Sequence, residues 1–372
     1  MKFDRLKEIV EDPWGTLGEM KERGKKVVGY ACSYVPEELI IAAGAHPARL
    51  TGTREGIRLA DGHLQSYCCS LVRGILEDGL SGRGAVLDGV VFPHTCDSIQ
   101  RLSDIWRLNV KGGFHLDLVL PVKLDTDSAR DYLVDVLKRF LSDLERALGV
   151  EVSEADLRAS CLLTNEIRRL LHELYMIRWR RPELLAGADL HLLNRAVGIA
   201  DRNLIVETLR EAVADLGADG ARETTKGNKN ILLAGGMCST PDIFNLIAEA
   251  GGRVVWDDFC NGGRMFLEPL RLDGDPLAAV ADRFLSRVVC PCKHRGLTDR
   301  ANHLKALATE RGAGGVVFVH LKYCDPHAFD FPYLKAELEK AGIASLLLEV
   351  EDPLPPGAQI RTRLEAFLEM LD

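Results

Sequence analysis

Ten cysteines are the residues of this chain whose type and number most directly suggest chemistry. In a chain of 372 residues without signs of secretion, so many thiols favour metal binding or redox chemistry over disulfides. Five of them follow short apolar runs that are typical of buried strands, namely Cys32, Cys96, Cys238, Cys260 and Cys324. The other five are Cys68, Cys69, Cys161, Cys290 and Cys292.

The elements that would position these thiols alternate between strands and helices. Apolar runs at 26–31, 88–93 and 114–122 alternate with helical patterns, which is typical of parallel α/β units. From about 128 to 216, apolar residues recur three and four apart and predict long helices. The polar stretch 217–230 is the best linker candidate, and α/β alternation resumes after it with strands expected at NILLAGG, RVVWDDF, GVVFVHL and SLLLEVE.

We therefore expect an α/β fold with two Rossmann-like (flavodoxin-like) parallel-sheet domains and a helical insertion between them. The expected boundaries are 1–127 for the N-terminal α/β domain, 128–228 for the helical segment and linker, and 229–372 for the C-terminal α/β domain. Ligands of open α/β sheets bind outside the carboxyl ends of the strands. The cysteines that follow strands should thus share one crevice at the domain interface.

The spacing of the cysteines limits the kind of metal site. Zinc sites usually contain closely paired cysteines, and ferredoxins contain a run of closely spaced ones, whereas the only close pairs here are Cys68 with Cys69 and Cys290 with Cys292. An iron-sulfur cluster held by single cysteines from several strand ends fits best. Cys161, inside a predicted helix, is expected to be a packed, inert thiol.

Composition and charge exclude several other classes of protein. The chain carries 47 basic and 55 acidic side chains, and this net charge of −8 argues against binding to nucleic acid. Its first residues, MKFDRLKEIVEDPWGTLGEM, are amphipathic and acidic, unlike a signal peptide. No apolar run approaches the roughly 18 residues that a membrane span needs. We expect a cytoplasmic protein.

Six segments, in order, resemble the 2-hydroxyacyl-CoA dehydratase and benzoyl-CoA reductase family, specifically its cluster-bearing D component. They are GYACSYVPEELIIAAGAHPARLTG, YCCSLVRGILEDGL, DGVVFPHTCDSIQRL, GGRVVWDDFCNGGRMF, GVVFVHLKYCDPHAFDFPYLKAELE and LLLEVED. The resemblance implies that Cys69, Cys96 and Cys324 bind a 4Fe-4S cluster. It also implies an open iron site near Ser33, where substrate oxygen or water would bind.

The resemblance further implies single-electron chemistry and several partners. A separate ATP-hydrolysing activator would reduce the cluster, which would pass the electron to an acyl-CoA thioester and so drive loss of a hydroxyl or ring reduction. The chain itself lacks the phosphate-binding sequence G-x-x-x-x-G-K-[ST] and the dinucleotide fingerprint G-x-G-x-x-G. Family members form complexes of two homologous subunits, so a homodimer or heterodimer is expected. One alternative is a non-catalytic electron-carrier subunit.

The chain has more cysteines than this ligand set requires. Cys32, Cys260 and Cys290 match positions that carry cysteine in a sibling group, the double-cubane-cluster reductases of small molecules. The alternative is therefore an 8Fe-9S double cubane, with these three thiols as further metal ligands. Cys238 and Cys292 leave the second set ambiguous, and neither they nor Cys68 and Cys161 receive a role.

Other side chains are weaker candidates. His94, which lies beside Cys96, is the candidate proton donor, and His320 and His327 flank Cys324 in the same way. Arg73 and Arg264 could hold a phosphate of coenzyme A, although surface arginines are common. Glu37 and Glu38 open a predicted helix, where the dipole favours carboxylates for structural reasons alone.

Overall fold

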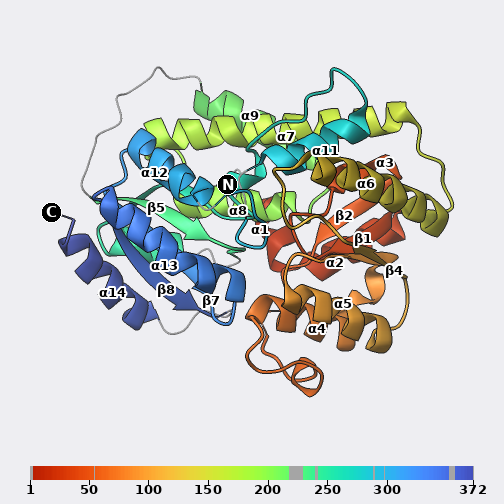
Figure 1. Ribbon diagram of the computed structural model, residues 1–372, viewed down its shortest axis with the longest axis horizontal. Helices are drawn as coiled ribbons and strands as arrows, with labels where there is room; N and C mark the ends of the chain where they lie inside the picture. The colour runs from red at the N-terminus through yellow and green to blue at the C-terminus, as the bar shows by residue number, and fades with distance from the viewer. Residues whose placement is uncertain are drawn as a thin grey trace.

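The computed structural model describes residues 3–53, 55–217, 229–238, 242–287, 290–296, 298–351 and 357–371. Its described strands form two four-stranded parallel sheets, with the orders β2-β1-β3-β4 and β6-β5-β7-β8. This confirms the α/β fold with two Rossmann-like sheets. Both sheets have the same topology, because in each case the first strand lies between the second and third and the fourth strand forms an edge. Figure 1 shows the two sheets side by side.

The strands of the first sheet are β1 (Lys26–Tyr30), β2 (Ala45–Arg49), β3 (Gly89–Pro93) and β4 (Phe114–Leu118), and those of the second are β5 (Asn230–Gly235), β6 (Arg253–Asp258), β7 (Gly315–Leu321) and β8 (Ala344–Val350). The helices are α1 (Asp4–Glu11), α2 (Pro13–Glu22), α3 (Glu37–Ala42), α4 (Ser70–Leu80), α5 (Asp97–Asn109), α6 (Asp127–Leu148), α7 (Glu154–Arg180), α8 (Gly187–Val197), α9 (Arg202–Gly217), α10 (Asp242–Glu249), α11 (Pro276–Ser286), α12 (Asp299–Arg311), α13 (Asp325–Lys340) and α14 (Gly357–Glu369).

The first sheet differs from the expected one at both edges. Strand β2 pairs with β1, but its sequence AHPAR contains three polar or proline residues and so lacks an apolar pattern. Proline is tolerated there because an edge strand has unpaired backbone groups on one side. Strand β4 ends at Leu118, four residues earlier than the expected apolar run, and the chain beyond it pairs with a distant segment at Lys123 and His294.

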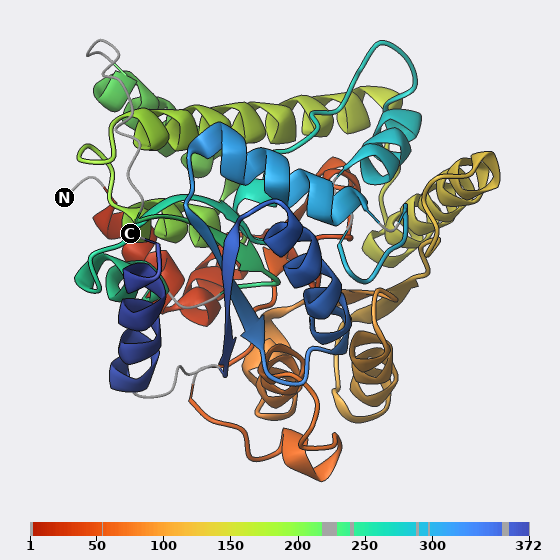
Figure 2. The same ribbon diagram turned by 60° about the vertical axis from the view of Figure 1, so that its left-hand side comes forward.

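The helical segment packs over both sheets, as Figures 1 and 2 show for the long helix α7. Its partners in the core come from both halves of the chain. Helix α11 from the second half joins the core cluster of β1, β3 and α6, while the N-terminal helix α1 joins that of α8, β5 and β7. A buried ion pair between Glu38 of α3 and Arg168 of α7 fixes the start of α3 against the helical segment.

The predicted linker 217–230 lies mostly outside the described residues, and the domain boundaries stay a prediction. Within the described residues, no helix is both long and apolar enough to cross a membrane.

Stability should depend on pH through His46 in β2. This histidine is buried, and its Nε2 donates to the carbonyl oxygen of Ile199 at 2.7 Å. Burial, and then the nearby Arg202, lowers the pKa of His46 to about 3. The unfolded chain therefore binds a proton near pH 6.5 that the folded chain refuses, and stability falls as the pH falls. Between pH 7 and pH 5 we expect a loss of about 2 kcal/mol from this group.

The measurement is urea unfolding of the wild type and of His46→Gln at both pH values. The variant should lose this part of the pH dependence, whereas replacing the exposed His63 with glutamine should leave it unchanged. An identical pH dependence in wild type and His46→Gln would contradict the assignment.

Candidate functional site

Seven of the ten cysteines line one cavity between the carboxyl ends of the two sheets. The loops that follow β1 and β3 contribute from one sheet, and those that follow β5, β6 and β7 contribute from the other. The thiols of this cavity, called here the sulfur cavity, are Cys32, Cys69, Cys96, Cys260, Cys290, Cys292 and Cys324. Because parallel strands end at a common edge, two sheets that face each other at those edges bring together residues far apart in the sequence.

Three of these thiols occupy the same local position. Cys69, Cys96 and Cys324 each immediately precede a helix, at the amino termini of α4, α5 and α13. The helix dipole at such a position favours a negative charge, and so favours thiolates and an anionic ligand. Cys69 and Cys96 come from the first half of the chain and Cys324 from the second. This set therefore spans both sheets.

A second group of thiols lies beside the first. Cys32 follows β1, Cys260 follows β6, and Cys290 follows α11. Cys292 connects the two groups, since its thiol interacts with those of both Cys96 and Cys290. Cys290 interacts in turn with Cys260. The seven thiols thus include two groups of three, with Cys292 between them.

The loop that carries Cys260 is held by the helical segment. Asp257, at the end of β6, accepts backbone N–H groups of Phe259 and Gly263 at 3.2 and 2.8 Å. The hydroxyl of Tyr175 in α7 donates to the same carboxylate at 2.6 Å. The Cys260 N–H donates to the carbonyl of Gly236 at 3.0 Å. Buried hydrogen bonds of this kind fix one loop conformation and hence the direction of the thiol.

The Cys290–Cys292 segment is held by the opposite half of the chain. The His294 N–H donates to the Val122 carbonyl at 2.7 Å, and the Leu124 N–H donates to the His294 carbonyl at 2.9 Å. The residues after β4 thus hold these two cysteines at the sulfur cavity.

Burial and mutual contacts determine the protonation of the thiols. Desolvation raises the pKa of Cys69 to about 12 and also raises that of Cys324. Hydrogen bonds from Cys260 and Cys292 lower the pKa of Cys290, and one from Cys292 lowers that of Cys96. Burial therefore outweighs the helix dipole at Cys69 and Cys324. A metal ion would reverse this balance, because a coordinating thiol is deprotonated outright.

Of the two residues predicted to be catalytic, one lies at the cavity. Ser33 lines the sulfur cavity, and its Oγ accepts a hydrogen bond from Arg287 at 3.1 Å. His94 is not among the residues that line it, and its Nε2 instead contacts Asp117 at 2.9 Å. His327, buried at the start of α13, does line the cavity and packs against His320.

Three cysteines lie outside the sulfur cavity. Cys68, Cys161 and Cys238 are buried in three separate core clusters, as expected for packed thiols. Arg73 forms an ion pair with Asp61, and Glu37 with Arg202. Sequence reasoning gave no role to Cys292. Its spacing of two residues from Cys290 was the one signal that could have indicated it.

The donor set suits an iron-sulfur cluster. Soft thiolates are the ligands of Fe–S clusters, and the remaining lining is largely apolar, with Val72, Ile99 and Leu321 among it. No three His, Cys, Asp or Glu side chains of the described parts are arranged to hold a single metal ion. A cubane is several atoms across, so its ligands stand farther apart than those of one ion.

Comparisons with known proteins agree on one family. The family profile of the 2-hydroxyglutaryl-CoA dehydratase D-component matches residues 32–371. The chain is 24% identical to the (R)-phenyllactyl-CoA dehydratase beta subunit of Clostridium sporogenes, covering 99% of this chain and 98% of the relative. Identity is 26% to the beta subunit of the lactoyl-CoA dehydratase of Anaerotignum propionicum, with the same coverage. It is 29% to a subunit of the benzoyl-CoA reductase of Thauera aromatica, covering 83% and 81%.

Proposed function

Because the chain belongs to the 2-hydroxyglutaryl-CoA dehydratase D-component family, we propose that Cys69, Cys96 and Cys324 hold a 4Fe-4S cluster that delivers single electrons to an acyl-CoA thioester. The chain is a component of a 2-hydroxyacyl-CoA dehydratase-type enzyme. The relatives include dehydratase and benzoyl-CoA reductase subunits, so the reaction is hydroxyl elimination or reduction of the acyl group.

The observation that carries the proposal is the convergence of these three thiols on one cavity. They come from three separate loops at residues 69, 96 and 324, each directly before a helix, and they meet in the sulfur cavity. Three protein thiolates leave one iron of a cubane without a protein ligand. An open metal position is what direct chemistry at a metal site requires.

When bound, the cluster would supply single low-potential electrons to the substrate thioester. The protein's own residues would do the rest. Ser33 presents its hydroxyl to the cavity and is oriented by Arg287, so it is placed to donate a hydrogen bond to a substrate oxygen. His327, rather than His94, is the histidine within the sulfur cavity. Desolvation lowers its pKa well below the usual value, so its imidazole is neutral.

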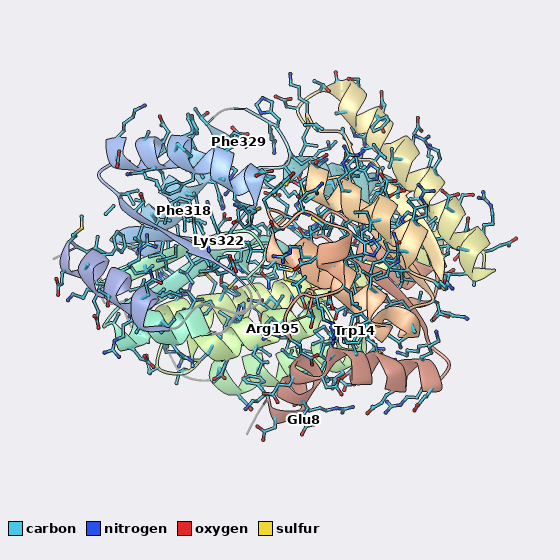
Figure 3. The ribbon with its side chains drawn as sticks, turned by 90° about the horizontal axis from the view of Figure 1, so that it is seen from below. Glu8, Trp14, Arg195, Phe318, Lys322 and Phe329 are labelled. Carbon is cyan, nitrogen blue, oxygen red and sulfur yellow. The ribbon has the colours of Figure 1, made fainter. Side chains whose placement is uncertain are left out.

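Access to the site is expected on the side of Cys96. A cleft of about 390 Å³ is lined by Cys96 and Pro326, which also line the sulfur cavity. Phe329 lines it too and projects from α13 (Figure 3). The acidic residues Asp97, Asp325 and Asp330 complete its polar lining. These carboxylates disfavour the phosphates of coenzyme A, so the cleft suits the thioester end of a substrate or a protein electron donor better.

The proposal requires partners. A separate ATP-hydrolysing activator would reduce the cluster, and a second, homologous subunit or a second copy of this chain would complete the enzyme. The dehydratase relatives carry the designation beta subunit, which is consistent with an assembly of unlike subunits.

A second candidate function has its own observation. Cys32, Cys260 and Cys290 form a further group of three thiols in the same cavity, and Cys292 contacts both groups. Three more thiolates are the ligands that a second cubane would need. The second candidate is therefore an 8Fe-9S double-cubane reductase of small molecules, activated in the same way.

The test begins with protein purified without oxygen and assayed for iron, sulfide and the paramagnetic resonance spectrum after reduction. We expect about four irons per chain for one cubane and about eight for two. The protein should then be combined with its homologous subunit, the activator, ATP and a reductant. Loss of water from a 2-hydroxyacyl-CoA would support the dehydratase, and no turnover with thioesters but reduction of small molecules would support the second candidate.

Iron near zero after anoxic reconstitution would contradict both candidates. A cluster that is reduced by the activator but supports turnover only when the substrate is bound by the other subunit would support the electron-carrier alternative.

A further inference from the structure

A second, smaller cavity lies beside the sulfur cavity and has an unusual charge. Its volume is about 30 Å³, and Ser33 lines both cavities. Five guanidinium groups and two carboxylates surround it, from Arg49, Arg168, Arg264, Arg283, Arg287, Glu37 and Glu38. All five arginines are at least nine-tenths buried. We call this space the arginine cavity.

Two of the five arginines have carboxylate partners. Arg168 is paired with Glu38, and Arg264 lies 3.4 Å from Asp258. Glu37 does not compensate the rest, because its carboxylate is paired with Arg202 at 2.7 Å. Both carboxylates of the arginine cavity are therefore already engaged.

The other three arginines form hydrogen bonds only with neutral groups of the described residues. Arg49 donates to the Tyr30 hydroxyl at 3.2 Å and contacts the Met265 sulfur. Arg283 donates to backbone carbonyls, with that of Glu268 at 2.8 Å. Arg287 donates to the carbonyl and the hydroxyl of Ser33 and stacks on Tyr34. Three positive charges are thus buried around one cavity with no carboxylate of the described residues at ion-pair distance.

Such an arrangement is costly unless an anion completes it. Buried charges in proteins are normally paired, because removing a charge from water costs several kcal/mol. Burial and the neighbouring guanidinium of Arg168 lower the pKa of Arg283 well below its usual value, which is consistent with a positive potential here. Guanidinium forks also match the geometry of oxyanions better than ammonium groups do.

We propose that the arginine cavity binds a small oxyanion of the carboxylate type, held by Arg49, Arg283 and Arg287 next to Ser33. A volume of about 30 Å³ exceeds the roughly 10–15 Å³ that one water needs and suits a group about the size of a carboxylate. A phosphate of coenzyme A together with its nucleotide is too large for it. The anion is either free or the free carboxylate of the acyl group of a substrate.

The binding of the anion does not require the cluster, but its place beside the reacting group rests on the proposed function. The test uses anoxically purified protein with its iron content measured in the same sample. Formate is titrated against a bulky sulfonate salt at constant ionic strength, and the thermal midpoint is recorded. We expect a saturable rise of roughly 3–5 °C at a concentration about one hundred times the dissociation constant.

The decisive variant is Arg49→Met, which removes one unpaired charge and keeps most of the side-chain volume. We expect its affinity for formate to fall at least tenfold, while its midpoint without formate stays equal to or above that of the wild type. A merely structural arginine would lower that midpoint instead. Arg287→Lys, which keeps the charge but loses the fork, should bind formate more weakly than the wild type.

The matched control is Arg130→Gln, because Arg130 is exposed and paired with Asp282 of α11 outside the arginine cavity. It should respond to formate as the wild type does. Competition by glutaryl-CoA but not by butyryl-CoA would assign the site to a carboxylate of the substrate, and the absence of competition would assign it to a free anion. No saturable rise with formate, or an unchanged rise in Arg49→Met, would overturn the proposal. Normal iron with no response to formate would refute the anion site alone.

Discussion

Replacing Cys96 with alanine is expected to remove the cluster that we assign to Cys69, Cys96 and Cys324. Cys96 lies at the start of α5, lines the sulfur cavity and contacts Cys292. A cubane held by three protein thiolates loses a third of its protein ligation in this variant, and the apolar walls of the cavity offer no oxygen ligand in its place. Iron and sulfide per chain should fall by about four atoms each, and the resonance signal of the reduced cluster should disappear.

Cys161→Ala is the matched control for this variant. Cys161 is also a buried thiol, but it lies in α7 within the core cluster of β1, β3 and α6. Its replacement should cost stability through the lost packing and leave the iron content unchanged. Full iron in Cys96→Ala, with the same loss of stability as in Cys161→Ala, would contradict the ligand assignment. Recovery of the signal in that variant by Cys292 would show up as an altered spectrum with about four irons.

Replacing Cys290 with alanine is expected to separate one cubane from two. Cys290 contacts both Cys260 and Cys292, and their hydrogen bonds make it the thiol most readily deprotonated in the second group. If Cys32, Cys260 and Cys290 hold a second cubane, iron should fall from about eight to about four per chain, and the cluster at Cys96 should remain. The measurement is the same anoxic iron and sulfide count with the resonance spectrum.

Cys238→Ala is the control here, since Cys238 is buried in the core next to the sulfur cavity's β5 loop but does not line the cavity. A wild type that holds about four irons and keeps all of them in Cys290→Ala would contradict the second cubane while leaving the first assignment intact. Loss of all iron in Cys290→Ala would mean that the two groups form a single, indivisible cluster.

The fold was predictable from the sequence because parallel strands buried on both faces are read as continuous apolar runs. The runs at 26–31, 88–93, 230–236 and 315–321 each became a strand of the observed sheets. Strand β2 was not predictable in this way, because its residues include His46, Pro47 and Arg49. They are buried by contacts with the segment near Ile199, which only the tertiary structure brings there.

The sequence by itself determined that thiols follow the strands, since a strand end and a cysteine are both local features. It also determined, through the family resemblance, which three of them to assign to one cluster. It did not determine that Cys292 belongs with them, because that depends on pairing between His294 and the chain after β4, which lies far away in the sequence. Only the tertiary structure placed seven thiols in one cavity.

The arginine cavity was decided by the tertiary structure alone. Arg49, Arg283 and Arg287 come from an edge strand, from α11 and from the end of that helix, and nothing in their spacing relates them. Helix α11 brings two of them to Ser33 because its apolar face packs on the first sheet rather than on its own. Local sequence fixes what each segment presents, whereas the charge of a cavity depends on which distant segments enclose it.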